Sequence, residues 1–256
     1  MTQSVKQDET RPGNLLVLGI VAVFCGIGAG FIGALFRLAL IDAARLRGAL
    51  VAWAHGWNLL GFGALAIVIA LSAAIAASMV RRFAPRAQGS GIPQVEAVLN
   101  RELKPGSPGL ILVKFIGGVL AIGSGLTLGR EGPSIQMGAT FAYESGKWFK
   151  RNWADCRVLL AAGAGAGLAT AFNAPISGAV FVLEELVKRF ESRIAIAALA
   201  ASAAAIWIER LILGNQPDFT VHHLVQPSFV HEPLYLALGV AAGFAGLTTT
   251  RRCCGA

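Results

Sequence analysis

The sequence predicts an all-α protein that crosses a membrane several times. Hydrophobic residues make up 55% of the 256 residues and charged residues only 14%, against roughly 25% charged in an ordinary soluble protein. The mean hydropathy is +0.63, and long stretches carry no Asp, Glu, Lys or Arg. The chain is too hydrophobic to be intrinsically disordered, and it has too little polar surface for a soluble globule.

Other classes of protein receive little support. A net charge of +8 suits a nucleic-acid binder, but the hydropathy opposes this, so we expect no nucleic-acid partner. No P-loop, nucleophile elbow or metal-ligand spacing occurs, so we expect no enzyme, no catalytic residue, no cofactor and no metal. The cysteines, at positions 25, 156, 253 and 254, are expected to be small buried hydrophobes. Interfacial or loop positions are expected for His55, His222, His223 and His231.

Uncharged stretches predict about six to eight membrane elements, since a helix needs about 20 apolar residues to cross the hydrocarbon. They cover residues 12–36, 48–80, 158–183, 194–208 and 233–250, and residues 115–143 are interrupted only by Arg130 and Glu131. The first stretch follows a polar start and is too long for the apolar region of a signal peptide.

Basic residues predict the orientation of the first two stretches. They are Lys6 and Arg11 before the first stretch, and Arg81, Arg82 and Arg86 after the second. The positive-inside rule places both groups in the cytoplasm, joined by a membrane hairpin, with Arg45 and Arg47 outside. Glycines four residues apart predict closely packed helices: Gly26 and Gly30, Gly163 and Gly167, and Gly239 and Gly243.

The first polar motif in these apolar regions is Gly89-Ser90-Gly91-Ile92-Pro93. Glycine permits unusual backbone angles, and proline suits the first turn of a helix, which we expect at residues 94–100. The motif is then a loop that leads into a helix N-terminus. The free N–H groups of that terminus and the serine hydroxyl can bind an anion. An ordinary capped turn is the alternative interpretation.

The second motif, Gly129-Arg130-Glu131-Gly132-Pro133, follows the same pattern in the middle of 29 otherwise uncharged residues. An ionisable group at membrane depth is costly and indicates a function. A glutamate at a helix N-terminus can place its carboxylate where an anion would bind. The alternative is a structural Arg130–Glu131 pair, which is disfavoured because adjacent residues do not face each other on a helix.

In the third motif, Asn173 and Pro175 can cap and begin a helix that ends at Glu184 and Glu185. From the residues alone, these carboxylates are a solvated helix end with surface ion pairs. Half-helices whose positive N-termini point inward bind anionic groups in many transporters. The residues therefore predict a polytopic membrane protein with an anion site and a carboxylate that competes for it.

Four stretches, in this order, resemble the CLC family of chloride channels and proton/chloride exchangers. They are GSGIPQVEAVL at 89–99, LVKF at 112–115, GREGPSIQMGA at 129–139 and GAGAGLATAFNAPISGAVFVLEE at 163–185. The similarity runs from about residue 15 to about residue 246. It implies the CLC-type inverted-repeat fold of broken and tilted helices, with the first repeat and the start of the second.

The resemblance also implies roles for single residues. Ser90 matches the serine that coordinates the central anion, within an anion-binding segment of Gly89, Ser90, Gly91, Ile92 and Pro93. Glu131 matches the gating glutamate, with Gly129, Arg130, Gly132 and Pro133 beside it. Glu185, rather than Glu184, matches the internal proton-transfer glutamate of exchangers. Lys114 matches a basic residue of the membrane domain, and serine at position 90 fits the chloride-preferring members.

The implied mechanism is exchange of chloride for protons without ATP. Ionised Glu131 fills the anion pathway, and its protonation weakens its hold on the positive helix ends, so that an anion replaces it. Glu185 would pass protons from the cytoplasm by a separate branch. A chloride channel without proton coupling is an alternative.

The resemblance further predicts the domain organisation. Residues 1–14 are expected to be a cytoplasmic tail, 15–247 a partial CLC transmembrane domain, and 248–256 an aberrant or truncated end. The GxFxP-type helix start and the downstream tyrosine that complete the anion site in the family are absent. A truncated, non-transporting fragment is therefore another alternative.

The expected partners are chloride and protons as transported ions, membrane lipid, and a second copy in a homodimer if the chain is complete. The expected localisation is a membrane, either the cell inner membrane or the plasma membrane, crossed in several passes.

Overall fold

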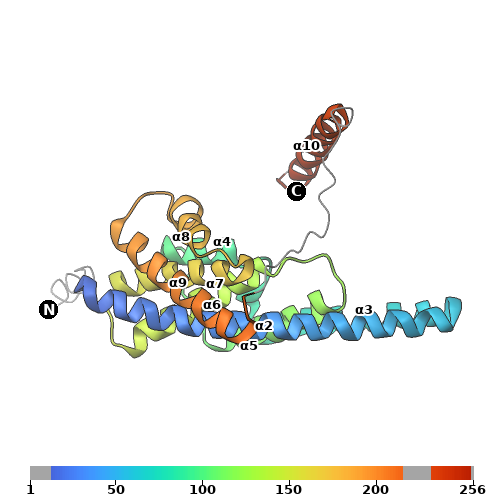
Figure 1. The fold of residues 1–256 in the computed structure, drawn as a ribbon, viewed down its shortest axis with the longest axis horizontal. Helices are drawn as coiled ribbons and strands as arrows, with labels where there is room; N and C mark the ends of the chain where they lie inside the picture. The colour runs from blue at the N-terminus through green and yellow to red at the C-terminus, as the bar shows by residue number, and fades with distance from the viewer. Residues whose placement is uncertain (1–12, 216–231, 255–256) are drawn as a thin grey trace. The chain divides into compact units, whose positions relative to one another are not determined.

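The computed structural model describes residues 13–215 and 232–254, and every regular element in these ranges is helical, as predicted (Figure 1). Most of the expected tail 1–14 lies outside the described residues, as do His222, His223 and His231. The elements in chain order are α2 (Leu15–Gly56), α3 (Asn58–Phe83), the 3₁₀ turn η1 (Pro85–Ala87), α4 (Ile92–Leu99), α5 (Gly109–Gly123), α6 (Glu131–Trp148), α7 (Trp153–Phe172), α8 (Pro175–Phe181), the π-helical turn η2 (Val182–Val187), α9 (Ser192–Leu213) and α10 (Glu232–Cys254).

Among the described residues, four helices are long and apolar enough to cross a membrane: α2, α3, α7 and α9. Two more apolar helices, α5 and the Pro233–Thr248 part of α10, are shorter. Together they match the lower end of the predicted number of membrane elements. The chain divides into two compact units, Met1–Asp218 and Phe219–Ala256, and α10 is the described part of the second.

The predicted stretch 48–80 is not one helix. Helix α2 continues without a break for 42 residues, about 63 Å at 1.5 Å per residue, and the chain turns at Trp57. The residues between the first two uncharged stretches are mostly Ala, Leu and Arg, which are strong helix formers. An ion pair of 2.9 Å between Arg45 and Asp42, three residues apart, also stabilises the helix within this stretch. In Figure 1, α3 and the end of α2 extend beyond the other helices of the first unit.

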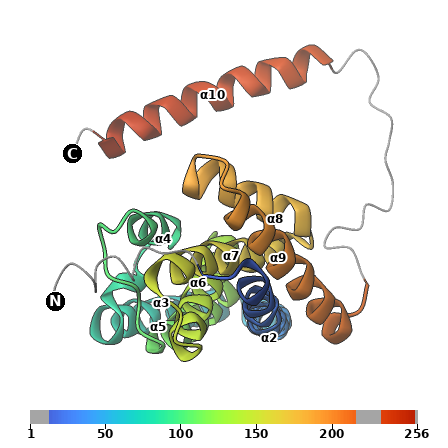
Figure 2. The same ribbon diagram turned by 90° about the vertical axis from the view of Figure 1, so that its left-hand side faces the viewer.

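Helix α7 forms the centre of the first unit. It lies between α6 and α9 (Figure 2) and also contacts α2 and α8. Every residue from 158 to 171 is buried. A Cβ on Gly167 would overlap the Ser134 carbonyl of α6, and a Cβ on Gly163 would come 3.0 Å from the Gly138 carbonyl carbon. The predicted close packing at this glycine pair is therefore confirmed.

Helices α2 and α9 pack equally closely. A Cβ on Gly26 would lie 2.7 Å from the Ala201 Cα, and one on Gly30 would lie 2.5 Å from the Ala205 carbonyl oxygen. An Arg37–Glu209 ion pair of 3.1 Å joins the same two helices. Close packing at Gly239 and Gly243 of α10 stays a prediction. Cys25 and Cys156 are buried as expected.

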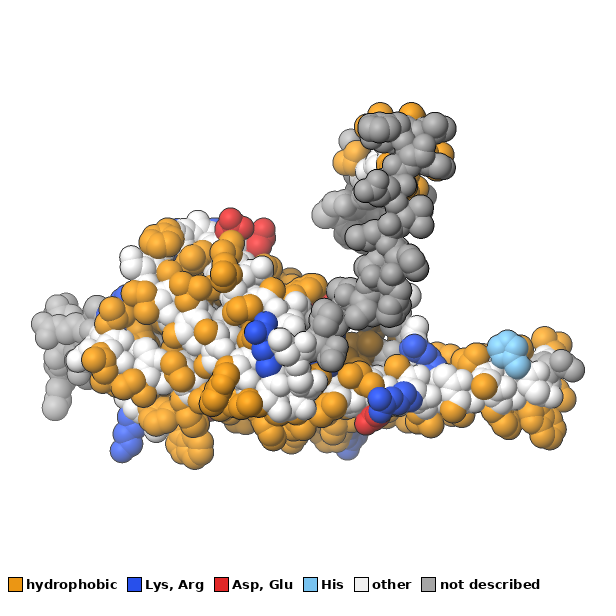
Figure 3. All heavy atoms as spheres, in the orientation of Figure 1, with side chains coloured by type: hydrophobic (Ala, Val, Ile, Leu, Met, Phe, Trp, Pro, Cys, Tyr) orange, Lys and Arg blue, Asp and Glu red, His pale blue; other side chains and the backbone are white. Residues whose placement is uncertain are grey.

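The outer surface is largely apolar. Hydrophobic side chains dominate the face drawn in Figure 3, and charged groups are few on it. Leu59, Leu60 and Trp148 each expose four-fifths or more of their surface. Large contiguous apolar surfaces are rare on soluble monomers, whereas contact with lipid accounts for them.

Candidate functional site

The loop before α4 has the structure that its motif predicts. Gly89 and Gly91 have φ angles of 68° and 98°, in the left-handed region that favours glycine. The Ile92 amide donates to Ser90 Oγ at 3.3 Å, which leaves the hydroxyl hydrogen of Ser90 for another acceptor. The helix begins at Ile92, two residues earlier than expected. The predicted loop and helix N-terminus are confirmed.

Helix α6 begins at Glu131, as its motif predicts, with Arg130 as N-cap. The glutamate side chain folds back toward the residues before the helix. Its carboxylate occupies the space that a Cβ on Gly129 would need. A carboxylate at this position interacts favourably with the positive end of the helix. Glu131 is half-buried and the following residue, Gly132, is buried.

The first two motifs meet at one cavity. A cavity of about 750 Å³ lies between α3, α5 and the starts of α4 and α6. Ser90 and Glu131 both line it, as does Lys114 of α5. The other walls are mainly small apolar residues of α3 and α5, among them Ala73, Ala76, Ala77, Val113, Gly117 and Gly118.

This arrangement has the chemistry of an anion site that carries its own competitor. Two helix N-termini, a hydroxyl group and the Lys114 ammonium group favour negative charge. The apolar walls strengthen these interactions because they keep the local dielectric low. The Glu131 carboxylate can satisfy the same positive groups in place of a bound anion.

The third motif differs in part from expectation. Asn173 does not cap the following helix: it ends α7 with a φ of 52°. Its Oδ1 accepts hydrogen bonds from Arg210 of α9 at 3.2 and 3.3 Å, so it is not available to an N-cap. Ala174 is the N-cap of α8, and Pro175 begins the helix as predicted.

Glu184 and Glu185 are not brought to the cavity. Both are exposed on the π-helical turn η2, and neither belongs to the cavity lining. Within the described residues, the ion pairs near η2 are made by Lys188 and Glu191, which follow the two glutamates in the sequence. Lys188 pairs with Glu96 of α4, and Arg157 of α7 pairs with Glu191 at 3.2 Å.

The surroundings of Glu191 and Lys188 shift the pKa of each side chain in the direction that favours its charged form. Partial burial alone would raise the pKa of the Glu191 carboxyl, but hydrogen bonds and charge from Arg157 and Arg189 lower this pKa overall. The hydrogen bond and charge of Glu96 raise the pKa of Lys188. Both pairs therefore stay charged at neutral pH and hold the connection between η2 and α9 against α4 and α7.

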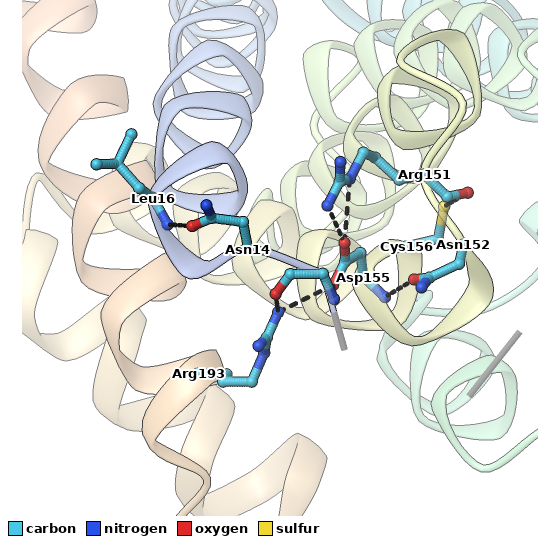
Figure 4. A network of polar contacts seen from close by, with 8 residues as sticks. Asn14, Leu16, Arg151, Asn152, Asp155, Cys156 and Arg193 are labelled. Atoms are coloured by element: carbon cyan, nitrogen blue, oxygen red, sulfur yellow. Dashed lines mark hydrogen bonds and ion pairs between the residues drawn. The ribbon is translucent and has the colours of Figure 1, made fainter. Parts of the chain in front are cut away.

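A second polar network, around Asp155, fixes the chain where it enters α2 (Figure 4). The buried Asp155 carboxylate accepts hydrogen bonds from Arg151 Nε at 3.0 Å and Arg193 Nη2 at 3.0 Å. It also accepts one from the Gly13 amide at 3.2 Å, while Arg193 donates to the Gly13 carbonyl at 2.8 Å. Asn14 then caps α2 by accepting from the Leu16 amide at 2.9 Å.

The sequence reasoning missed Asp155 and Gln136, both of which are buried. Gln136 is the one amide side chain in the mainly small and apolar segment 132–139, and this is the signal that could have found it. Asp155 is close in sequence to Arg151, Asn152 and Arg157, so no such signal marks it. The part of the chain that the structure describes contains no group of three or more His, Cys, Asp or Glu residues able to hold a metal.

The described helices, the apolar surface and the cavity at two helix starts define a multi-pass membrane protein. The sequence model of the voltage gated chloride channel family matches residues 72–252, and the chain belongs to this family.

Curated relatives cover nearly all of the chain. It is 39% identical over 248 residues to the H(+)/Cl(-) exchange transporter ClcA of Vibrio parahaemolyticus, with 95% of this chain and 53% of the relative covered. It is 37% identical over 248 residues to ClcA of Citrobacter koseri, with 94% and 51% covered. The chain spans about half the length of the curated relatives it matches.

Solved structures share the fold. A slow cyanobacterial Cl−/H+ antiporter matches with a TM-score of 0.80 and 32% identity, over 94% of this chain and 57% of the antiporter. A CLC-type fluoride/proton antiporter matches with a TM-score of 0.69 and 24% identity, over 91% and 55%. The second match supports the fold alone.

Proposed function

We propose that the chain takes part in chloride transport across the membrane as a proton-coupled exchanger. The observation that carries the proposal is that Ser90 and Glu131, from two separate motifs, line one cavity at two helix N-termini. Relatives named as H(+)/Cl(-) exchange transporters support it.

In this proposal the Ser90 loop binds chloride and Glu131 gates the site. The ionised carboxylate competes with chloride for the positive helix ends, and protonation removes its charge. Proton binding at Glu131 therefore favours chloride entry. Glu185 is proposed to transfer protons toward Glu131 from the side of the membrane where η2 lies.

A chloride channel without proton coupling is the second candidate. It is favoured by one observation: Glu185 lies on an exposed turn and is not part of the cavity lining. The two candidates differ in proton movement and not in chloride movement, so both ions have to be measured.

The test is ion flux in liposomes that contain the purified chain. With a chloride gradient imposed, the exchanger proposal predicts chloride movement together with opposite proton movement. Glu131→Ala should abolish the proton flux, and Glu185→Gln should reduce it while chloride still flows. Glu144→Gln, which removes a carboxylate paired with Lys147 outside the cavity, should change neither flux.

The outcomes separate the candidates. Chloride flux without proton flux in the unchanged chain would establish the channel. No flux of either ion would contradict the transport proposal for this chain and favour a non-transporting fragment.

We further propose that residues 15–247 form the transmembrane domain and that two copies assemble as a homodimer in lipid. The exposed apolar surface of the first unit supports the contact with lipid. Stepwise photobleaching of labelled chains in membranes would count the copies, and single-step bleaching at high protein density would contradict the dimer.

A further inference from the structure

Side chains hold four consecutive backbone carbonyls next to the anion loop. Gln136 Nε2 donates to the Arg86 carbonyl at 2.9 Å. Lys114 Nζ donates to the carbonyls of residues 87 and 89, both at 2.8 Å. Gln94 Nε2 donates to the carbonyl of residue 88 at 2.8 Å. We call the side chains of Gln94, Lys114 and Gln136 the carbonyl clamp.

The three side chains of the clamp come from three different helices, α4, α5 and α6. Two of them are almost completely buried. Lys114 exposes 6% of its surface and Gln136 only 3%. Gln136 also lies against the loop: a Cβ on Gly91 would come 2.7 Å from its Oε1. Within the described residues this buried oxygen has no hydrogen-bond partner. Such groups are rare in folded proteins and require an explanation.

The clamp fixes the direction of the loop amides. All described peptide bonds are trans, so each carbonyl and the N–H that follows it lie in one plane and point in opposite directions. With the carbonyl of residue 89 held on Lys114, the Ser90 N–H points away from Lys114. With the carbonyl of residue 88 held on Gln94, the Gly89 N–H points away from Gln94.

The loop needs this restraint because its own sequence does not impose one conformation. Gly89 and Gly91 both have positive φ, and glycine populates many backbone conformations. A carbonyl that rotated toward the cavity would present a negative dipole to an anion. Held by the clamp, the same carbonyls are hydrogen-bonded and their paired N–H groups keep one orientation.

We infer that Gln94, Lys114 and Gln136 are positioning residues that set the chloride affinity of the Ser90 loop. None of them has to contact the ion for this role. The inference rests on the proposed function, because it assumes that the loop binds chloride.

The test measures the chloride dissociation constant of the purified chain by titration calorimetry. Gln136→Leu and Gln94→Leu remove donors without changing the charge of the site. Loss of one such hydrogen bond should weaken chloride binding about five- to tenfold. In flux measurements the half-saturating chloride concentration should rise while the maximal rate stays the same, which general loss of folding would not produce.

Thr140→Val is the matched control. Its Oγ1 donates to the Gln136 carbonyl at 2.7 Å, so the substitution also removes a buried bond from a side chain to a carbonyl on α6. It leaves the loop untouched, and chloride affinity should not change.

A second pair of variants addresses Lys114. Lys114→Arg keeps the charge and more than one donor, and should stay within about twofold of the unchanged chain. Lys114→Met should bind chloride at least fivefold more weakly. Lys114→Met also removes a positive charge that lines the cavity, so weaker binding by this variant alone does not establish positioning. Equal affinities for the two Lys114 variants would still contradict the inference if either leucine variant fails to fold.

The outcomes are distinguishable. If the unchanged chain binds chloride and both leucine variants bind it with the same affinity as the unchanged chain, the inference is overturned. Equal chloride affinities for the two Lys114 variants would overturn it as well. Absence of chloride binding by the unchanged chain would overturn the proposed function and the inference together.

Discussion

Gly132, the second residue of α6, leaves no space for a side chain beside Ser90. A Cβ at this position would overlap the Ser90 carbonyl oxygen and come 2.8 Å from its carbonyl carbon. The helix start that carries Glu131 therefore packs directly on the loop that carries the serine hydroxyl. This contact fixes the spacing between the proposed gate and the proposed anion ligand.

Gly132→Ala should displace the loop at residues 89–91. Overpacking of this kind costs about 1–3 kcal/mol, so the thermal unfolding midpoint in detergent and the chloride affinity should both fall. Gly19→Ala is the control, because a Cβ on Gly19 of α2 would meet nothing within 4 Å. Equal midpoints and affinities for the two variants would show that the contact does not position the loop.

Asp155→Asn should destabilise the first unit. The substitution keeps the shape of the side chain but leaves Arg151 and Arg193 without their carboxylate partner. Removing one partner of a buried ion pair costs about 3–5 kcal/mol, which a lower thermal unfolding midpoint would reveal. Asp42→Asn removes an exposed carboxylate paired with Arg45 and should have little effect. A similar midpoint for both variants would argue against a stabilising role of the Asp155 network.

The connection between η2 and α9 should loosen in acid. Since the Glu191 pKa is lower in the folded chain than in the unfolded chain, its ion pairs contribute fully above the unfolded value of about 4.5 and are lost as the pH falls through the folded value. Hydrogen exchange of residues 186–193 should therefore be steady, after correction for intrinsic rates, from about pH 8 to about pH 5 and should quicken below it.

Arg157→Gln provides the control for that measurement. It removes the guanidinium that pairs with Glu191, so the acid-dependent increase in exchange should shrink. An equal increase in the variant would assign the loosening to another group.

Local chemistry explains which parts of the site were predictable. The starts of α4 and α6 were predicted to within two residues because Gly91, Pro93 and Pro133 act within one turn, through a backbone angle and missing amides. The competing carboxylate was predicted because Glu131 is an ionisable residue in an otherwise uncharged stretch. These signals need no knowledge of the rest of the fold.

Contacts between distant segments were not predictable in this way. Gln136 acts on Arg86, 50 residues away in the sequence, and Arg193 acts on Gly13 across 180 residues. The continuation of α2 past residue 48 was missed because a charged stretch was assumed to end the helix, although its residues favour helix. Asn173 was expected to cap α8, but its contact with Arg210 of α9 depends on tertiary packing.

Competition between Glu131 and chloride is the central claim, and the pH dependence of chloride binding tests it most directly. The chloride dissociation constant of the unchanged chain should decrease as the pH is lowered, because protonation of Glu131 removes the competitor. Glu131→Gln cannot ionise at this position, so its chloride affinity should be high and nearly independent of pH. The same pH dependence in Glu131→Gln as in the unchanged chain would contradict the account.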